Sequence, residues 1–364
     1  MISLNEFLIH KTDEERCQWL NSYLKEVTKL HQNRQAATLE ITVTSTSEYT
    51  LEIASLPNSS LTDNKWCIAN LIDCLTRLYP RYDRYLSQLW HPDSFIKDYP
   101  PLKTIEKRVY KKRKAREKNL KHCFENNTHF QVSKSWNHYQ VIQKAFDGPE
   151  LTRLLQAPDQ AIAEGEILKD CKATTVSLYK MANGQKVIIK RYNSKGTAYS
   201  LTRSLIDSRA RVCWQGALLL DQIGISTPKN LAMLEVRQGP WIKTSYLITE
   251  FKEGETLSDL YREEHEQSSW PTIARQVEDI LLTYPRVRVA HGDFKATNFI
   301  IDKNQPIMID LDSFRSCSFF KIFKDTYFRD LDRFERNWVR CPSAMKLFTP
   351  IIQNARYSCL SATL

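Results

Sequence analysis

The sequence contains no run of about 18 consecutive apolar residues, the length that a membrane-spanning helix requires. Its first residues, MISLNEFLIHKTDEER, also lack the basic start, the long apolar stretch and the small-residue cleavage site of a secretory signal. We therefore expect a cytoplasmic protein that touches the inner face of a membrane at most peripherally.

The nine cysteines form no C-x-x-C pair and no Cys/His cluster at the spacing of a zinc site. They are scattered irregularly between Cys17 and Cys359, and their number is odd. This distribution indicates reduced thiols and argues against a disulfide framework, and no structural zinc is expected.

Internal repeats and low-complexity linkers are also missing, so the composition is that of a globular protein. Of the 364 residues, 42% are hydrophobic and 26% are charged, which suffices for a core and a polar surface. The chain is longer than a usual single domain, and two domains are expected.

Positive charge is concentrated in one segment. Residues 103–121 contain ten Lys or Arg and two Glu, a local charge of +8 out of the total of +10. Such a helix can attract an anionic membrane surface, a phosphorylated glycolipid or nucleic acid, or it is a solvated helix that merely covers one face. Since Tyr110 is its only aromatic residue and no base-reading module surrounds it, no nucleic-acid partner is expected.

Residues 1–135 predict a small α+β region whose role the sequence does not indicate. Apolar residues recur at helical spacing in 12–32 and 66–79, and residues 38–54 alternate as two strands would. The basic segment that follows is expected to be a helix.

From about residue 160 the pattern changes to short strands and then to helices. The predicted strands are residues 164–170, 173–181, 186–192, 231–236 and 244–250, with a helix at about 201–222 and a hairpin turn at Asn183-Gly184. Helices follow at about 256–264, 270–283 and 326–338. The predicted fold is therefore α+β, a bilobal protein-kinase-like domain at 150–345 (N-lobe about 160–250, C-lobe about 251–345), with the N-terminal α+β region before it and a tail at 346–364.

The strongest chemical signal is the run His291–Asn298, HGDFKATN, followed by the acids of IDLD at Asp310 and Asp312. Phosphoryl transfer to a hydroxyl needs a carboxylate near the attacking oxygen and ligands for Mg²⁺ on the nucleotide. The expected base is Asp293, Lys295 faces the transferred phosphate, and the metal ligands are Asn298, Asp310 and Asp312. Each residue alone could cap a turn, but the complete set favours a kinase.

Upstream segments fit the same chemistry. The apolar strand Val187–Lys190 ends in a lysine that would hold the α- and β-phosphates of ATP. The strand Tyr246–Phe251 runs into a predicted hinge, where the backbone around Glu250 would meet adenine. ATP and Mg²⁺ are thus the expected cofactors.

Several runs together resemble the lipopolysaccharide kinase family of Gram-negative bacteria: residues 189–193, 208–210 with Trp214, 224–228, HGDFKATNFI, IDLDSF and 330–334. The similarity covers about residues 150–340. It implies phosphorylation of a hydroxyl of Kdo or heptose in the inner core, on a lipid A-linked acceptor at the cytoplasmic face of the inner membrane.

Two features depart from kinase patterns. The segment Leu168–Val176, expected over the phosphates, has no glycine, and Lys169 and Thr174 are the residues there that we expect to contact phosphate. The helix after Lys190 has no glutamate to pair with this lysine. Either Gln215 substitutes for the glutamate, or Lys190 is positioned in another way.

Two other functions stay open. A protein Ser/Thr kinase would use residues 1–135 for docking, but the short segment after Asp312 and the lack of an A-P-E motif favour a small or glycolipid acceptor. A catalytically silent scaffold would fit the missing glutamate and the glycine-free loop, whereas the intact Asp293, Asn298 and Asp310 argue against it.

Overall fold

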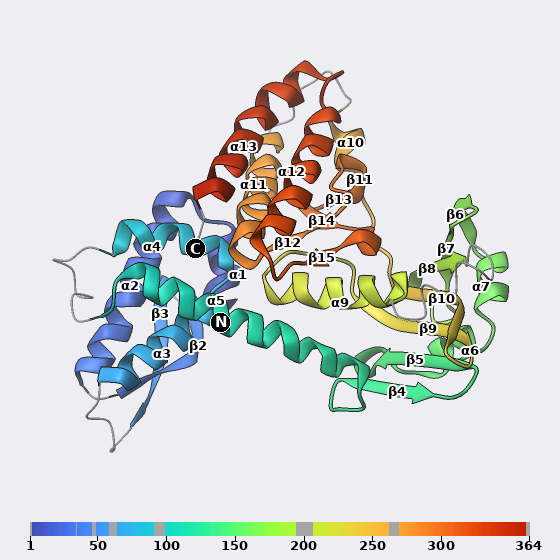
Figure 1. Cartoon of the computed structure of the whole chain (residues 1–364), viewed down its shortest axis with the longest axis horizontal. Helices are drawn as coiled ribbons and strands as arrows, with labels where there is room; N and C mark the ends of the chain where they lie inside the picture. Colours follow the sequence, from blue (N-terminus) through green and yellow to red (C-terminus); the bar gives the residue numbers. More distant parts are fainter. Residues whose placement is uncertain are drawn as a thin grey trace. The chain divides into compact units, whose positions relative to one another are not determined.

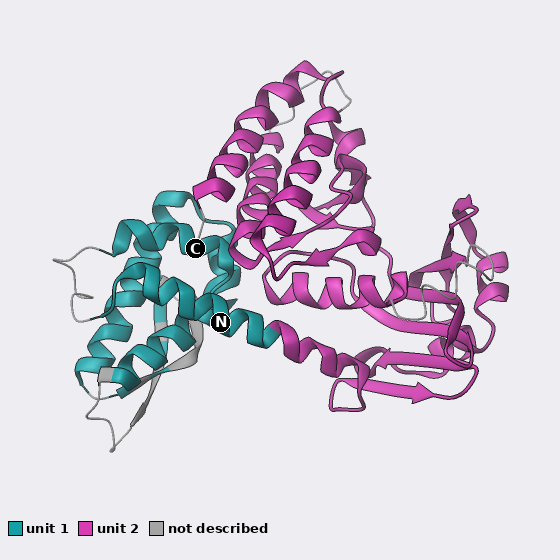
Figure 2. Ribbon diagram, viewed as in Figure 1, with its two compact units in different colours: residues 1–116, 362–364 teal, residues 117–361 magenta. Residues whose placement is uncertain are grey.

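The structure is a computed structural model that describes residues 2–33, 35–45, 49–57, 64–90, 99–193, 207–261 and 269–361. The chain divides into two compact units, the first ending at Arg116 and the second comprising Glu117–Ser361 (Figure 2). In these described ranges, no helix is both long enough and apolar enough to cross a membrane.

The first unit contains a three-stranded antiparallel sheet, ordered β1 (Ile2–Ser3), β2 (Gln35–Ser45), β3 (Tyr49–Pro57). Its helical elements are α1 (Leu4–Ile9), α2 (Asp13–Gln32), α3 (Asn64–Arg77), η1 (Pro80–Tyr82), α4 (Asp83–Leu89) and the first part of α5 (Leu102–Asn119). Helix α2 begins at a capping box formed by Thr12 and Glu15, and its apolar face is buried. The predicted helices, strand pair and basic helix of this region are confirmed.

The second unit is built on a seven-stranded antiparallel sheet, ordered β4-β5-β9-β10-β8-β7-β6 (Figure 1). Its strands are β4 (Phe130–Lys134), β5 (His138–Gln143), β6 (Glu166–Cys171), β7 (Thr174–Lys180), β8 (Lys186–Asn193), β9 (Asn230–Gln238) and β10 (Trp241–Glu250). The connecting helices are η2 (Leu120–Phe124), η3 (Lys144–Phe146), α6 (Pro149–Gln156), α7 (Pro158–Glu164) and α9 (Arg209–Gln222). Gly184 has φ +87° in the turn between β7 and β8, as the hairpin prediction requires.

Five strands were expected in this sheet, and the β4–β5 hairpin accounts for the other two. Strand β5 pairs with β9, with Val141 opposite Met233, and both side chains are fully buried. Since the hairpin pairs with β9, it belongs to the second unit. This unit begins at Glu117, ahead of the expected start at residue 150 and inside the expected 1–135 region. The sequence could not assign these two strands to the sheet, because β9, the strand with which β5 pairs, lies far from them along the chain.

The helical part of the second unit contains α10 (Leu257–Leu260), α11 (Trp270–Val287), α12 (Phe320–Arg336) and α13 (Pro342–Ser361), with short η4 (Ala296–Asn298) and η5 (Leu311–Ser313). Small strands join it: β11 (Glu255–Thr256), β13 (Phe299–Asp302) and β14 (Gln305–Met308) form one sheet, and β12 (Val289–Ala290) pairs with β15 (Arg315–Ser316). The predicted helix at 201–222 is shorter as described, since α9 begins after the N-cap Ser208 and residues 194–206 lie outside the described residues.

The structure corrects the prediction of a tail at 346–364. Residues 346–361 belong to α13, whose side chains Phe348, Ile352, Ala355 and Cys359 are all buried. These four positions follow i, i+4, i+7 and i+11, one face of a helix, and that face packs into the core of the unit. This segment is therefore part of the domain.

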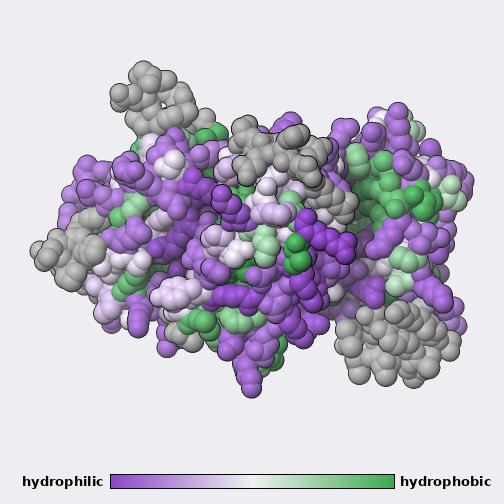
Figure 3. Space-filling model, turned by 90° about the horizontal axis from the view of Figure 1, so that it is seen from above, coloured by the Kyte–Doolittle hydropathy of each residue, from purple (hydrophilic) through white to green (hydrophobic). Residues whose placement is uncertain are grey.

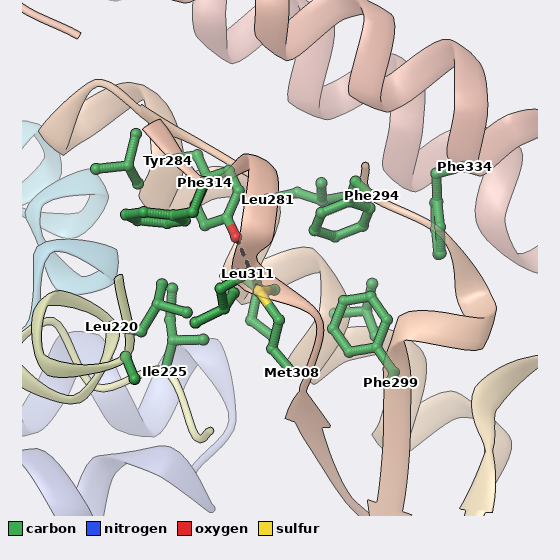
Figure 4. Close-up of a cluster of buried hydrophobic side chains, with 14 of the residues drawn as sticks. Leu220, Ile225, Leu281, Tyr284, Phe294, Phe299, Met308, Leu311, Phe314 and Phe334 are labelled. Carbon is green, nitrogen blue, oxygen red and sulfur yellow. Dashed lines mark hydrogen bonds between the residues drawn. The ribbon is translucent and has the colours of Figure 1, made fainter. Parts of the chain in front are cut away.

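Aromatic packing holds the loop that follows β12 in place. Phe294 is fully buried, and its ring centroid lies 5.1 Å from those of both Phe299 and Phe334 (Figure 4). Beside this group, the Tyr284 hydroxyl donates to Met308 Sδ at 3.0 Å, which links α11 to β14 (Figure 4). Residues 293–295 are thus attached to the rigid core through the Phe294 side chain.

Candidate active site

A cavity of about 440 Å³ lies between the seven-stranded sheet and the helical part of the second unit. Its lining is largely apolar, with Val176, Ile188, Ala217 and Leu247 among its residues. On the face seen in Figure 3, apolar side chains gather over the part of the second unit that carries this sheet. A mostly apolar hollow of this size with a few polar groups is typical of a small-molecule site.

The polar groups of the cavity come from both sides of it. Lys169, Lys190 and Glu250 belong to the strands, and Asn298 and Asp310 belong to the segments around β13 and β14. All five residues were predicted from the sequence, and the structure brings them to one hollow. Thr174 is not among the residues that line it; it is only 6% exposed and lies within the β6–β7 hairpin. Its predicted contact with phosphate stays a prediction.

Lys190 lies in the middle of β8, opposite Val176 on β7 and Leu247 on β10. Its ammonium contacts Asp310 Oδ1 and lies 2.7 Å from Asp312 Oδ1. Burial alone would lower the pKa of Lys190, but the carboxylates of Asp312 and Asp310 outweigh burial and raise this pKa. The lysine is therefore a fixed positive charge at the end of the cavity.

Since α9 has no glutamate, other side chains must pair with Lys190. Gln215, one of the two alternatives, lines a different hollow of the unit, whereas Cys213 faces the cavity. The ring of Tyr192 lies 5.2 Å from the ammonium of Lys190, and the Tyr192 hydroxyl donates to Asp312 Oδ1 at 3.5 Å. Two aspartates and an aromatic face thus position the lysine in place of a helix carboxylate.

The loop His291–Asn298 follows β12 and is fixed by hydrogen bonds at both ends. Gly292 has φ +79°, and a Cβ there would lie 2.3 Å from the Ser313 carbonyl oxygen, so only glycine fits. At the other end, the amide nitrogen of Asn298 donates to the Asp293 carbonyl at 2.8 Å. The amide oxygen of Asn298 is then the atom left for a cation.

His291 is completely buried and supports this loop. Its Nε2 lies 3.1 Å from the Ile309 carbonyl, and the backbone N–H of Asp293 donates to its Nδ1 at 3.3 Å. Burial lowers the pKa of His291, so the ring is neutral and Nε2 carries the proton. A neutral ring satisfies both contacts, and a positive charge is not needed.

The carboxylate of Asp293 lies between two cations. Lys295 Nζ is 2.8 Å from its Oδ2, and Arg333 Nε is 3.4 Å from its Oδ1. Both cations are partly exposed, at 41% and 32%, and the carboxylate is 29% exposed. Asp293 is therefore reachable from solvent while its charge is stabilised.

Asp310 follows β14 directly and adopts a left-handed backbone, with φ +62° and ψ +57°. This conformation is unusual for a residue with a side chain, although Asp and Asn tolerate it best. Burial alone would raise the pKa of Asp310, but Asp312 and Lys190 together lower it strongly. Burial and the neighbouring Asp310 instead raise the pKa of Asp312, so Asp310 is the stronger acid of the two.

Oxygen ligands for a hard cation are present at this place. The Asp310 carboxylate and the Asn298 amide belong to adjacent segments, since the Ile309 N–H donates to the Asn298 carbonyl at 2.9 Å. No cluster of three or more His, Cys, Asp or Glu able to hold a metal occurs within the described parts of the chain. This donor set fits Mg²⁺, which binds one or two protein oxygens and completes its shell with water and phosphate.

Two supporting residues were not singled out for a role from the sequence: Asp330 and Arg333 on α12. Asp330 is 1% exposed, and its Oδ2 and Oδ1 accept from the backbone N–H groups of Gly292 and Phe294 at 2.8 and 3.3 Å. Arg333 donates to the Gly292 carbonyl at 2.8 Å. The D-L-D-R-F run at 330–334 contributed to the family resemblance, but only the fold shows that Asp330 and Arg333 hold the loop in place.

Replacing Asp330 with alanine is expected to lower the free energy of unfolding by about 3–5 kcal/mol, because Arg333 and two buried N–H groups lose their acceptor. Chemical denaturation of the full chain measures this. Asp332→Ala, which removes the neighbouring, 55% exposed carboxylate that pairs with Arg356, is the matched control and should cost about 1 kcal/mol or less. Equal losses in the two variants would contradict the clamp.

The predicted hinge lies at the end of β10. The backbone N–H of Phe251 donates to the Lys186 carbonyl, and Glu250 Oε1 accepts from the Lys229 backbone N–H at 2.8 Å and lies 3.0 Å from Lys252 Nζ. Residues 250–252 all line the cavity. The Glu250 side chain is thus used to fix the hinge, and the backbone there borders the hollow.

Comparisons with known proteins identify a family for this part of the chain. A family model described as the lipopolysaccharide kinase (Kdo/WaaP) family matches residues 163–345, half of the chain. A search of curated proteins returned no match. One similar solved structure is the Rio2 kinase–ADP/Mg²⁺–phosphoaspartate complex from Chaetomium thermophilum, with 12% identity, a TM-score of 0.36, and coverage of 72% of this chain and 86% of that one. The matched family segment contains every residue that lines the cavity.

Proposed function

The chain belongs to the lipopolysaccharide kinase (Kdo/WaaP) family, and from this premise we propose that it transfers the γ-phosphoryl group of ATP to a hydroxyl of Kdo or heptose in the lipopolysaccharide inner core. The observation that carries the proposal is the meeting of Lys190, Asn298 and Asp310 at one cavity, with Asp293 on the same loop as Asn298. A phosphoryl-transfer site needs this set and little else.

The reaction joins the sugar hydroxyl oxygen to the γ-phosphorus and breaks the bond from that phosphorus to the β–γ bridging oxygen, which releases ADP. Asp293 accepts the proton of the hydroxyl, and Lys295 offsets the charge on the transferred group. Lys190 binds the α- and β-phosphates. Asn298 and Asp310 would hold Mg²⁺, with Asp312 assisting through Lys190, and the metal would supply positive charge to the β- and γ-phosphates.

The adenine base occupies the apolar end of the cavity, between Val176, Ile188 and Leu247, and its edge meets the backbone at 250–252. Lys169 lies in β6 and lines the cavity, where it contacts the phosphates of ATP. Thr174, in the same β6–β7 hairpin, is proposed to contact the phosphates as well. Glu250 acts by holding the hinge, in line with its bond to the Lys229 backbone.

We propose that the basic segment 103–121 binds the anionic cytoplasmic surface of the inner membrane. Its lysines at 103, 107, 111, 114, 118 and 121 follow helical spacing along one face. On the opposite face, Ile105 and Val109 are buried, Lys112 pairs with Asp73, and Arg116 donates to the Thr76 carbonyl at 3.0 Å. The helix thus separates a packing face from a lysine face suited to acidic headgroups.

A glycolipid acceptor fits the segment after Asp312 better than a protein acceptor does. Strand β15 begins at Arg315 and helix α12 at Phe320, so only a short stretch separates the metal segment from the next helix. A protein kinase offers its substrate a longer platform here. The silent-scaffold alternative loses one of its two arguments, because Lys190 has partners in spite of the missing glutamate. The glycine-free segment Leu168–Val176 is the argument that it keeps.

The test is transfer of labelled γ-phosphate from ATP to purified deep-core lipopolysaccharide and, in parallel, to casein. We expect label in the glycolipid only. The label should disappear when EDTA removes Mg²⁺, because the charge on the β- and γ-phosphates is then no longer neutralised by the metal. Label in casein alone would favour the protein kinase. Absence of label with measurable ATP binding would favour the scaffold.

A further inference from the structure

A second hollow of the kinase unit, of about 530 Å³, lies along another face of α9. Cys213 and Ala217 of this helix face the nucleotide cavity, whereas Val212, Gly216 and Leu219 line the second hollow. Its other walls are the segments 117–121 and 314–322. We call it the α9 groove.

The floor of the α9 groove is apolar. Phe314 and Leu219 contribute to it, and Gly216 allows close packing, since a Cβ there would lie 3.0 Å from the Phe314 ring. At the rim, Phe319 is 72% exposed and Ile322 is 53% exposed. Two large apolar side chains exposed beside one hollow indicate a surface that an apolar ligand covers.

The rim of the same groove carries positive charge. Lys118, Lys121 and Arg315 are exposed there, and none of them has an ion-pair partner among the residues that the structure describes. Two carboxylates also line the groove: Asp207, which lies 3.7 Å from Arg211 Nε, and Glu117, which has a contact of its own. The net chemistry therefore suits a ligand with an apolar chain and an anionic headgroup.

The groove adjoins the catalytic loop. Its wall residues Arg315 and Ser316 form β15, which pairs with Val289 and Ala290 of β12, immediately before His291. A ligand held in the groove thus lies against the same small sheet that positions Asp293. A bounded hollow of about 530 Å³ favours a single ligand molecule over the broad face of a bilayer.

We propose that the α9 groove binds the anionic, acylated lipid part of the acceptor, with an acyl chain on the apolar floor and a lipid phosphate at the basic rim. This inference rests on the proposed function and deepens it. It separates recognition of the lipid from the transfer chemistry, which occurs at the sugar.

The double variant Phe319→Ser, Ile322→Ser tests the proposal through the KM for two acceptors. For the acylated glycolipid in detergent, KM should rise at least about tenfold, since about 1.4 kcal/mol of apolar contact corresponds to that factor. For the deacylated core oligosaccharide and for ATP, KM should not change. Val339→Ser, at a residue 64% exposed in the same unit, is the matched control and should change neither.

Equal rises in KM for both acceptors, or no rise for either, would overturn the proposal. Retained KM in detergent together with lost binding to phosphatidylglycerol vesicles would also overturn it, because the surface would then serve the bulk membrane. If the wild type labels neither acceptor, the proposed function fails, and calorimetric binding of lipid A alone decides: binding that the double variant loses supports the groove, and no binding by the wild type rejects it.

Discussion

Asparagine in place of Asp310 should lower the rate of phosphoryl transfer by about 10⁴-fold, because a metal ligand that stabilises the transition state by several kcal/mol loses its charge. Asparagine is the informative substitution here. Asp310 has φ +62°, a backbone conformation that asparagine adopts nearly as readily as aspartate, whereas alanine would add strain. The variant therefore tests charge and metal binding, not the fold.

Initial rates with saturating ATP and acceptor measure this effect, and a Mg²⁺ titration shows whether the apparent metal affinity falls as well. Asp312→Asn is the control within the same segment. Asp312 lies 2.7 Å from Lys190 but does not line the cavity, so we expect a loss of only about tenfold, comparable to one charge-assisted contact. A larger loss for Asp312→Asn than for Asp310→Asn would reverse the two assignments.

The meeting of the site's residues could be predicted from the sequence because its parts are local. The residues from His291 to Asn298 lie within eight positions, and Asp310 follows after one short hairpin, so motif spacing alone places them together. Lys190 is more than 100 residues away from them, but the apolar stretch that leads into this lysine marks it. These are cases in which local sequence and tertiary position agree.

What the sequence could not give are contacts between distant segments. The partner of Lys190 depends on how β8 meets the segment after β14, and no spacing rule describes that pair. The place of the β4–β5 hairpin depends on its pairing with β9, about 90 residues later. The clamp by Asp330 is of the same kind, since an Asp on a helix normally indicates a solvated face, whereas this one is buried.

Asp293→Ala is expected to lower the turnover of the sugar acceptor by about 10³-fold, within the range that a positioned general base contributes. ATP binding should persist, because Asp293 does not line the nucleotide cavity and Lys190, Asn298 and Asp310 remain. The variant also leaves Lys295 and Arg333 without their shared carboxylate, so Asp293→Asn is measured beside it to keep the side-chain volume.

Single-turnover transfer, fluorescence titration of a nucleotide analogue and thermal unfolding separate the possible causes of a loss. Asp302→Ala removes a carboxylate at the end of β13, outside the residues that line the cavity, and should behave as the wild type does in all three. Retained transfer in both Asp293 variants would reject this residue as the base. Lost nucleotide binding would mean instead that the carboxylate holds the loop in place through Lys295 and Arg333. The loss of transfer would then not identify Asp293 as the base.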